Sequence, residues 1–310
     1  MNIVVTPDRL PDNALPVDPE FAALYVDVTC EGALLAAKRK ACFVGLARDI
    51  AGVLPLSIER IEQTARHFAD WSAIVLENDS TDGTKELLSE WAYRQRDHVI
   101  VEMSDNGKPH LHGFEQARTE AMAGYRNRCR ELVEKHCGDA DYVIIVDLDA
   151  WGGWSTHGVM NGIGWHERLP DAGCMASTSL FKHDAYRIGQ DTIWCHYDNW
   201  AYRCYGWAPR LGPWFTFWLP PPGHPPLEVN SAFGGLGIYK TAAYLASDYS
   251  GEDCEHVPFH ARIKEKGWSI FLNPSQRCVM TWLADEGDEE PSDGGHNGDD
   301  QRAAVPAGLA

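Results

Sequence analysis

The sequence predicts an α/β fold with a largely parallel sheet flanked by helices. Short apolar runs rich in β-branched residues alternate with longer amphipathic stretches, which is the pattern of βα units. The run 142–146 is apolar at every position, as expected of a strand that is covered on both faces. With 310 residues, 44% of them hydrophobic, the chain is long enough for one large domain or two small ones.

The first half alternates regularly between the two kinds of element. We expect strands at 41–47, 73–76, 98–102 and 142–146, and helices at 50–68, 84–96 and 113–136. The first of these helices has apolar residues at a helical spacing: Val53, Leu54, Ile58, Ile61, Ala65 and Phe68.

The pattern changes after Ala150, where Gly, Trp and Pro punctuate what we expect to be shorter elements. Order returns with a strand and turn at 228–239, helices at 241–246 and 253–266, and a strand at 268–272. The chain therefore divides into an N-terminal extension (1–40), two halves (41–150 and 151–284) and an acidic tail (285–310). Because the tail has almost no apolar residues, we expect it to be disordered.

The charge and cysteine content exclude several classes of protein. Forty-five acidic and 27 basic residues give a formal charge of −18, which would repel a phosphate backbone, so nucleic-acid binding is not expected. The nine cysteines include no CxxC pair and are interpreted as reduced thiols. Residues 1–19 lack the basic and then hydrophobic layout of a secretory signal, and no apolar stretch approaches the ~20 residues that span a bilayer, so we expect neither feature. We expect a cytoplasmic protein, with peripheral membrane attachment left open.

Two acidic motifs follow predicted strands. The first is the polar turn from Glu77 to Thr84, which lies where loop carboxylates hold a nucleoside in open α/β sheets; helix capping is the alternative reading. The second is Asp147-Leu148-Asp149, whose two carboxylates can approach one divalent cation. A solvated strand end is the alternative for the second motif.

Basic residues precede the second motif, and a third acidic motif lies far along the chain. Arg118 and Arg126 share roughly one face of the helix 113–136 and are suited to phosphate contact, or to a solvated basic face. The segment 251–256 (GEDCEH) opens a predicted helix, where a carboxylate can cap the helix or act as a general base. His256 and His260 are four residues apart and share a helix face, a spacing that can bind a metal.

In this order, the three acidic motifs resemble those of the GT-A nucleotide-diphospho-sugar glycosyltransferases, particularly the family-2-like enzymes, over about residues 41–279. The order of Arg126-Asn127, Asp147-Leu148-Asp149 and the segment 229–235 is also similar to the fungal capsule-type α-1,3-mannosyltransferases. The resemblance implies a GT-A, Rossmann-like sheet and a metal-dependent hexosyltransferase that builds a glycan or polysaccharide. The half 41–150 would then bind the nucleotide sugar, and the half 151–284 the acceptor.

The resemblance also implies roles for individual residues. Nucleotide-sugar contacts would come from Arg48, Glu77, Asn78, Asp79, Asp82, Arg118, Arg126 and Asp147. Mn²⁺ or Mg²⁺ would be held by Asp147, Asp149 and, as a further candidate, His256. Asp253 would activate the acceptor hydroxyl, with Glu255 as a competing base. Glu77 and Asn78 stand where many relatives have two aspartates. The preferred nucleobase therefore stays open, and the donor can be GDP-mannose or a UDP-sugar.

The tryptophan-rich segment is expected to form the acceptor side of such a site. Eight of the twelve tryptophans fall in 151–218, and flat apolar faces with one polar edge suit stacking on pyranose rings. The candidate acceptor contacts are Trp194, Trp200, Trp207, Trp214, Gly234 and Gly235. A small second core under a long loop is the alternative reading of the tryptophans.

Three alternatives to an inverting transferase stay open. The capsule-type enzymes retain configuration, whereas the Glu-Asp motif suits an inverting displacement. A sugar-phosphate nucleotidyltransferase uses a similar sheet and metal, but the loop after strand 41–47 lacks the expected Gly-rich, basic character. A non-catalytic carbohydrate-binding protein would account for the tryptophans alone. The oligomeric state, the linkage and the identity of the acceptor are not predicted.

Overall fold

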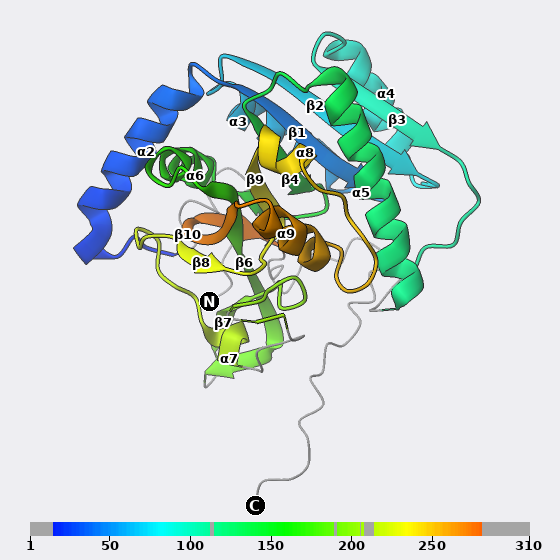
Figure 1. Cartoon of the computed structure of the whole chain (residues 1–310). Helices are drawn as coiled ribbons and strands as arrows, with labels where there is room; N and C mark the ends of the chain where they lie inside the picture. The colour runs from blue at the N-terminus through cyan, green and yellow to red at the C-terminus, as the bar shows by residue number, and fades with distance from the viewer. Residues whose placement is uncertain (1–14, 112–114, 189–190, 205, 208–213, 281–310) are drawn as a thin grey trace, which may run out of the picture.

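The computed structural model describes residues 15–111, 115–188, 191–204, 206–207 and 214–280 (Figure 1). They form a mixed sheet whose main strand order is β3-β2-β1-β4-β9-β6-β10-β5, with β7 beside β6 and β8 beside β10. The strands are β1 (Lys40–Ala47), β2 (Asp70–Asn78), β3 (Val99–Ser104), β4 (Tyr142–Asp147), β5 (Gly153–Trp154), β6 (Ala172–Ile188), β7 (Asp191–His196), β8 (Leu227–Val229), β9 (Leu236–Lys240) and β10 (Ser269–Val279).

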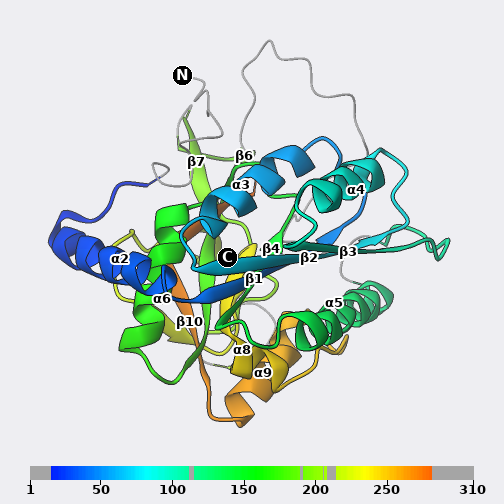
Figure 2. The ribbon, with the colours of Figure 1, turned by 90° about the horizontal axis from the view of Figure 1, so that it is seen from above.

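Helices cover both faces of this sheet (Figure 2). The helical elements are η1 (Pro19–Phe21), α2 (Ala22–Ala36), α3 (Leu54–Ala65), α4 (Thr84–Arg94), α5 (Gln116–His136), α6 (Thr156–Arg168), α7 (Trp214–Phe217), α8 (Thr241–Leu245) and α9 (His256–Glu265). Strands β1 to β4 are parallel to one another, whereas β9 runs antiparallel between β4 and β6. The predicted α/β fold is therefore confirmed. None of the described helices is long and apolar enough to cross a membrane.

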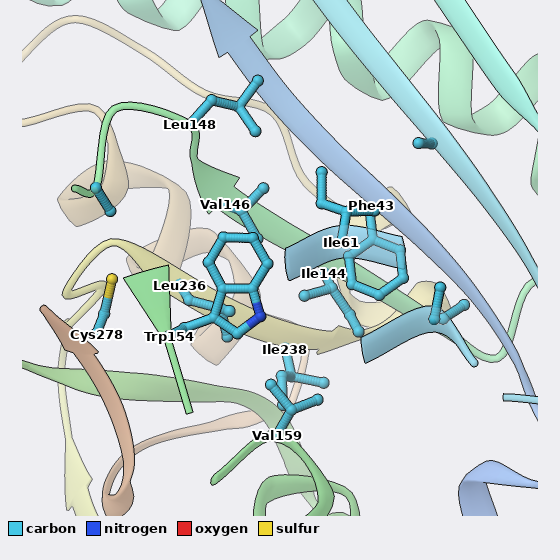
Figure 3. Packing of buried hydrophobic residues seen from close by; sticks show 14 of the residues in the cluster. Phe43, Ile61, Ile144, Val146, Leu148, Trp154, Val159, Leu236, Ile238 and Cys278 are labelled. Carbon is cyan, nitrogen blue, oxygen red and sulfur yellow. The ribbon is translucent and has the colours of Figure 1, made fainter. Parts of the chain in front are cut away.

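Two hydrophobic clusters hold the layers together. Side chains of β1, β4 and β9 alternate between the two faces, so that Ile144 belongs to the cluster under α3 and α6 and Ile145 to the cluster under α5 and α9. Figure 3 shows the first cluster, in which Trp154 lies beside Val146 and Val159 lies beside Ile238. This alternation across a buried sheet explains why 142–146 is apolar at every position.

The elements of the first half lie within a few residues of their predicted bounds. The prediction for 151–226 is wrong, because this part contains the 13-residue helix α6 and the 17-residue strand β6. The glycines of α6 were predicted to interrupt regular structure, but they lie within the helix and allow it to pack closely on α2 and β10. A Cβ on Gly164 would lie 2.3 Å from the carbonyl oxygen of Val28 in α2, and one on Gly158 would lie 2.4 Å from that of Ser275 in β10.

Two further boundaries differ from the prediction. The extension 1–40 contains α2, which packs on α6; a Cβ on Gly32 of α2 would lie 1.8 Å from the carbonyl oxygen of Met160. The last helix begins at His256 rather than at residue 253, and residues 251–254 form bends before it. The tail predicted to be disordered lies outside the described residues.

Candidate functional site

The predicted motifs meet at one edge of the sheet. Parallel pairing places Ala47 of β1 beside Glu77 of β2, and Leu46 beside Asp147 of β4. Because β1, β2 and β4 run in the same direction, their C-terminal ends lie at one edge of the sheet. The 77–84 turn and the Asp147-Leu148-Asp149 motif therefore lie on either side of β1. This is the edge at which open α/β sheets bind ligands.

The 77–84 turn is held by its own hydrogen bonds and by the loop after β1. The carboxylate of the fully buried Glu77 accepts a hydrogen bond from the Ser80 amide at 2.8 Å, and its other oxygen has no partner among the described residues. Asp82 accepts hydrogen bonds from the Ala51 amide at 2.8 Å and the Thr84 hydroxyl at 2.7 Å. Asp82 thus fastens the start of α4, which supports the capping reading of that residue.

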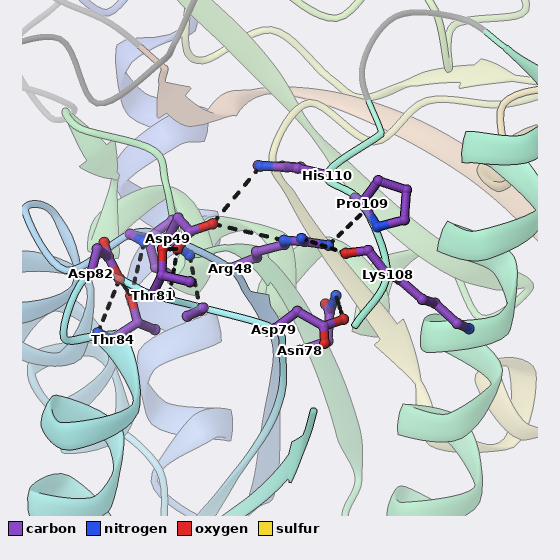
Figure 4. Close-up of polar contacts among 12 residues, drawn as sticks. Arg48, Asp49, Asn78, Asp79, Thr81, Asp82, Thr84, Lys108, Pro109 and His110 are labelled. Carbon is purple, nitrogen blue, oxygen red and sulfur yellow. Dashed lines mark hydrogen bonds and ion pairs between the residues drawn. The ribbon is translucent and has the colours of Figure 1, made fainter. Parts of the chain in front are cut away.

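Asp79 and Arg48 fix the loop that follows β3 over these strand ends (Figure 4). Asp79 has a left-handed backbone, with φ at 57°, and one oxygen accepts from the amides of Asn106 and Gly107 at 2.7 and 2.8 Å. Arg48 donates to the carbonyl oxygens of Lys108 and Pro109 at 2.8 and 3.3 Å. Both predicted nucleotide contacts are therefore used to position a loop. Left-handed backbone in a residue other than glycine is a form of strain that is common at functional sites.

Asn78 belongs to the same edge. Its amide nitrogen lies 3.3 Å from the hydroxyl oxygen of Tyr125 in α5, and Lys108 lies over the ring of Tyr125 at 5.8 Å from the ring centroid. Asn78 is 6% exposed, so it is almost completely buried beneath this edge of the sheet.

The Asp147-Leu148-Asp149 motif is anchored by its middle residue. The side chain of Leu148 is 1% exposed and lies directly over Gly45, where an added Cβ would be 2.7 Å from it. The carbonyl oxygen of Leu148 accepts a hydrogen bond from Ser57 at 2.6 Å. Residues 148 and 149 form a turn at the end of β4, in which Leu148 is buried while Asp147 and Asp149 are partly exposed.

Arg126 joins the second and third motifs. Its Nε donates to Glu255 Oε1 at 2.8 Å, and its guanidinium lies 3.6 Å from Asp147 Oδ1. Burial at the base of the site and the charge of Asp149 raise the pKa of the Asp147 carboxyl to about 8, whereas Arg126 acts in the opposite direction. This electrostatic setting favours the arrival of a further cation.

An aromatic stack supports Arg126 from below. The guanidinium carbon lies 5.2 Å from the ring centroid of Phe233, and the Phe233 ring in turn stacks on His256 with centroids 4.0 Å apart. His256 is 2% exposed, and burial holds its pKa well below the usual value. Neither ring nitrogen has a hydrogen-bond partner among the described residues, and Nε2 lies 3.7 Å from Glu255 Oε1. His256 therefore contacts Glu255 and Phe233 in the layer that supports Arg126.

Asp253 and Glu255 differ in their partners and in their exposure. Glu255 is 5% exposed at its side chain and paired with Arg126, whereas Asp253 is 30% exposed and paired with Arg203 at 2.8 Å. The side chain of Arg203 is 1% exposed and also donates to the carbonyl oxygens of Trp200 and Tyr202. Of the two candidate bases, Asp253 has the more exposed side chain.

The predicted acceptor residues are spread over several environments. Trp200 packs partly against the core and lies under Arg118, at 5.2 Å from the guanidinium carbon to the ring. Trp194 packs on Leu180 and Val279, whereas Trp207 is 43% exposed. Trp214 lies in α7, and its side chain is outside the described part of the structure. The tryptophans therefore serve partly as core, as the alternative reading expected.

Gly234 and Gly235 form a tight turn between β8 and β9. Both have left-handed backbones, with φ at 66° and 79°, and a Cβ on Gly234 would lie 2.1 Å from the carbonyl oxygen of Ser177. The carbonyl oxygen of Gly235 accepts a hydrogen bond from the Asp147 amide at 2.8 Å. The turn thus positions Asp147.

The carboxylates of Asp147 and Asp149 fit the oxygen chemistry of Mn²⁺ or Mg²⁺. Within the described residues, no three His, Cys, Asp or Glu side chains come together as a metal-binding group. A cation held by these two aspartates would therefore need further oxygen ligands from a substrate or from water, which Mg²⁺ commonly has.

Three residues of the site were not predicted from the sequence: Asp198, Arg203 and Phe233. Arg203 and Phe233 support Asp253 and Arg126, and Asp198 follows β7 with its carboxylate bonded to the Gly234 amide at 2.9 Å. Asp198 and Arg203 stand in no recognisable motif, and Phe233 lies in the segment 229–235 but was assigned no role there.

No protein-family model matches the sequence, and a search of curated proteins gives no match. Solved structures that resemble this fold include the mannosyltransferase PcManGT from Pyrobaculum calidifontis in complex with GDP-Man and Mn²⁺, with 13% identity and a TM-score of 0.48 over 86% of this chain and 68% of that chain. GalNAc-T7 with UDP, GalNAc and Mn²⁺ has 11% identity and a TM-score of 0.49, covering 91% and 56%. TarS from S. aureus (residues 1–349) has 11% identity and a TM-score of 0.45, covering 77% and 60%. At such distances these comparisons do not define an activity for this chain.

Proposed function

We propose that the protein is a metal-dependent glycosyltransferase, which moves a sugar from a nucleotide-diphospho-sugar to a hydroxyl group of a glycan or polysaccharide acceptor. The proposal rests chiefly on one observation: the partly exposed Asp147 and Asp149 lie at the edge that also carries the 77–84 turn, with the guanidinium of Arg126 beside Asp147. Paired carboxylates and a buried arginine at such an edge suit a diphosphate with its cation.

The cation would be held by Asp147 and Asp149. When bound, Mn²⁺ or Mg²⁺ neutralises a diphosphate and stabilises it as a leaving group. Arg126 supplies a fixed positive charge at the same place, since Glu255 and Phe233 hold its guanidinium. Preorganised charge of this kind is worth more in a partly buried site than in water.

The acceptor proton would be taken by Asp253. Its carboxylate is more exposed than that of Glu255, which is committed to the buried pair with Arg126. A carboxylate aimed at an acceptor hydroxyl suits an inverting displacement, which we favour over a retaining one. GDP-mannose and UDP-sugars are the proposed donors, and the exposed side chain of Trp207 is a proposed part of the platform for the acceptor.

Calorimetry with UDP and GDP, each with and without Mn²⁺, tests the proposal. We expect one of the two nucleotides to bind and its affinity to rise at least tenfold when Mn²⁺ is present. A panel of UDP- and GDP-sugars, monitored for hydrolysis without acceptor, then identifies the donor. The absence of metal-dependent nucleotide binding would refute the transferase function, and the anomeric configuration of a transferred sugar separates inversion from retention.

A further inference from the structure

Asp198 is a carboxylate of the site that no motif indicates. It follows β7, and its two oxygens accept hydrogen bonds from the backbone amides of Ala201 at 3.1 Å and Gly234 at 2.9 Å. Its own amide donates to the hydroxyl of the buried Ser179 at 2.9 Å. Three hydrogen bonds therefore fix both the backbone and the side chain of Asp198.

This anchoring ties Asp198 to the aspartates of β4. The amide of Gly234 bonds to Asp198, and the carbonyl oxygen of the next residue, Gly235, bonds to the amide of Asp147. The negative charge of Asp198 raises the pKa of Asp147, and burial raises the pKa of Asp198. The turn at Gly234 and Gly235 therefore holds Asp198 and Asp147 close to each other.

Asp198 differs from the other acids of the site in its partners. Glu255 is paired with Arg126 and Asp253 with Arg203, whereas no lysine or arginine of the described residues pairs with Asp198. Nor does it join Asp147 and Asp149 in a three-residue metal-binding group within that part of the chain. The backbone amides of Gly234, Ala201 and Trp200 occupy three of the roughly four acceptor sites of the carboxylate, so it can still accept a hydrogen bond from a hydroxyl group.

The neighbours of Asp198 have the character of a sugar-binding surface. Tyr197, the residue before Asp198, is 41% exposed. Trp200 follows Asp198 by two residues, and the guanidinium of Arg118 lies over its ring. Aromatic faces pack against the C–H faces of a pyranose, while a fixed carboxylate accepts hydrogen bonds from the hydroxyl groups of the sugar. Fixed groups lose little entropy when they bind a ligand, which makes them effective in selecting one sugar over another.

We propose that Asp198 is a specificity-determining residue that binds hydroxyl groups of a pyranose in the site, either in the donor sugar or in the acceptor. This inference rests on the proposed glycosyltransferase function and adds to it a residue outside the nucleotide, metal and base positions.

The test compares Asp198→Asn and Asp198→Ser with the control Asp191→Asn. Asp191 is exposed and is the first residue of β7, the strand that Asp198 follows. Asp198→Ser removes the carboxylate without adding an NH2 group that would face the backbone amides, so it serves if the asparagine variant does not fold. Thermal unfolding identifies the variants that are folded. For these, calorimetry measures the affinity for UDP or GDP with Mn²⁺ and for the sugar nucleotide that the wild type hydrolyses.

We expect affinity for the nucleoside diphosphate to stay within twofold of wild type in all three variants. If the hydroxyls belong to the donor, both Asp198 variants should lose at least tenfold in hydrolysis of that sugar nucleotide and discriminate less among sugars. If they belong to the acceptor, hydrolysis should be unchanged and the KM of a mono- or oligosaccharide acceptor should rise at least tenfold.

Two results would overturn the inference. One is a parallel loss of nucleoside diphosphate affinity, which would make Asp198 part of the metal site or of the fold. The other is unchanged hydrolysis together with unchanged acceptor KM. Neither result would affect the proposed function, because that function fails only if the wild type shows no metal-dependent nucleotide binding.

Discussion

At the scale of single residues, the site is organised around Arg126. Its guanidinium is 8% exposed, touches Glu255 on one side and Asp147 on the other, and rests on Phe233. A buried charge of this kind is stable only with partners, so the carboxylates of two distant motifs are needed for the arginine as well as for chemistry. This dual use explains why only some of the acids at this edge are accessible.

Asp149→Ala tests the cation site directly. The substitution removes one of two proposed ligands, and Asp149 is partly exposed. We therefore expect Mn²⁺-dependent nucleotide binding to be lost while the thermal midpoint stays within a few degrees of wild type. Calorimetry and thermal unfolding measure the two effects. Asp97→Ala is the matched control, since exposed Asp97 precedes β3 and lies at the opposite edge of the sheet. Normal Mn²⁺-dependent binding by Asp149→Ala would contradict the assignment.

Asp253→Asn and Glu255→Gln should separate catalysis from structure. Asp253→Asn is expected to keep nucleotide binding within about twofold and to lower transfer by roughly a hundredfold or more, the range for loss of a general base. Glu255→Gln leaves Arg126 without its charged partner and should destabilise the fold by about 3–5 kcal/mol. Transfer rates under saturating donor and chemical denaturation measure these outcomes. An Asp253→Asn variant with full activity would exclude Asp253 as the base.

At the scale of elements, close helix packing in the region after Ala150 is the feature that sequence patterns did not predict. Helix α6 contains three glycines, and two of them touch the backbone of α2 or β10 so closely that a side chain cannot fit. Glycine lowers helix propensity by about 1 kcal/mol relative to alanine, so its use here implies a compensating gain from packing. Helix propensity can be assessed from the sequence, whereas the gain from packing can be assessed only from the structure.

Gly164→Ala should therefore destabilise the protein, although alanine is the better helix former. The added Cβ would lie 2.3 Å from the Val28 carbonyl oxygen, and overpacking of this kind costs about 1–3 kcal/mol. Gly124→Ala in α5 is the matched control, because no atom lies within 4 Å of its new Cβ. That control should gain about 0.5–1 kcal/mol from reduced backbone freedom. Urea unfolding of the two variants gives the comparison, and equal signs for the two changes would contradict the packing argument.

At the scale of the whole molecule, the sequence predicted the elements of residues 41–150 and missed much of the rest. The strands 41–47 and 142–146 were correctly predicted because a buried parallel strand shows as an uninterrupted apolar run. The edge at which Glu77 and Asp147 meet followed from the polarity of those strands. The pairing of Arg126 with Glu255, 129 residues apart, and the position of Asp198 depend on how β6, β7 and β9 cross the sheet. No local pattern contains that information.

The buried histidines lead to an expectation for the stability of the whole fold. Burial lowers the pKa of His166 to about 4 and those of His196 and His260 to about 3. An unfolded histidine has a pKa near 6.5, so below that pH the unfolded chain binds protons that the native chain does not. The stability that these histidines contribute is complete above pH 6.5 and falls as the pH approaches 4. Each of them should reduce the free energy of unfolding by up to about 1.4 kcal/mol per pH unit in this window.

The measurement is urea unfolding at several pH values between 7.5 and 4.5. His260 is a suitable probe because it is fully buried, with Ser231 and Tyr239 as hydrogen-bond partners at 2.9 and 2.8 Å. His260→Gln removes one titrating group, so we expect a less stable protein at pH 7.5 whose stability falls less steeply with acid, by about one proton. His136→Gln, at an exposed position, should leave the steepness unchanged. An unaltered pH dependence in His260→Gln would mean that the imidazole is already protonated, or already open to solvent, in the native protein.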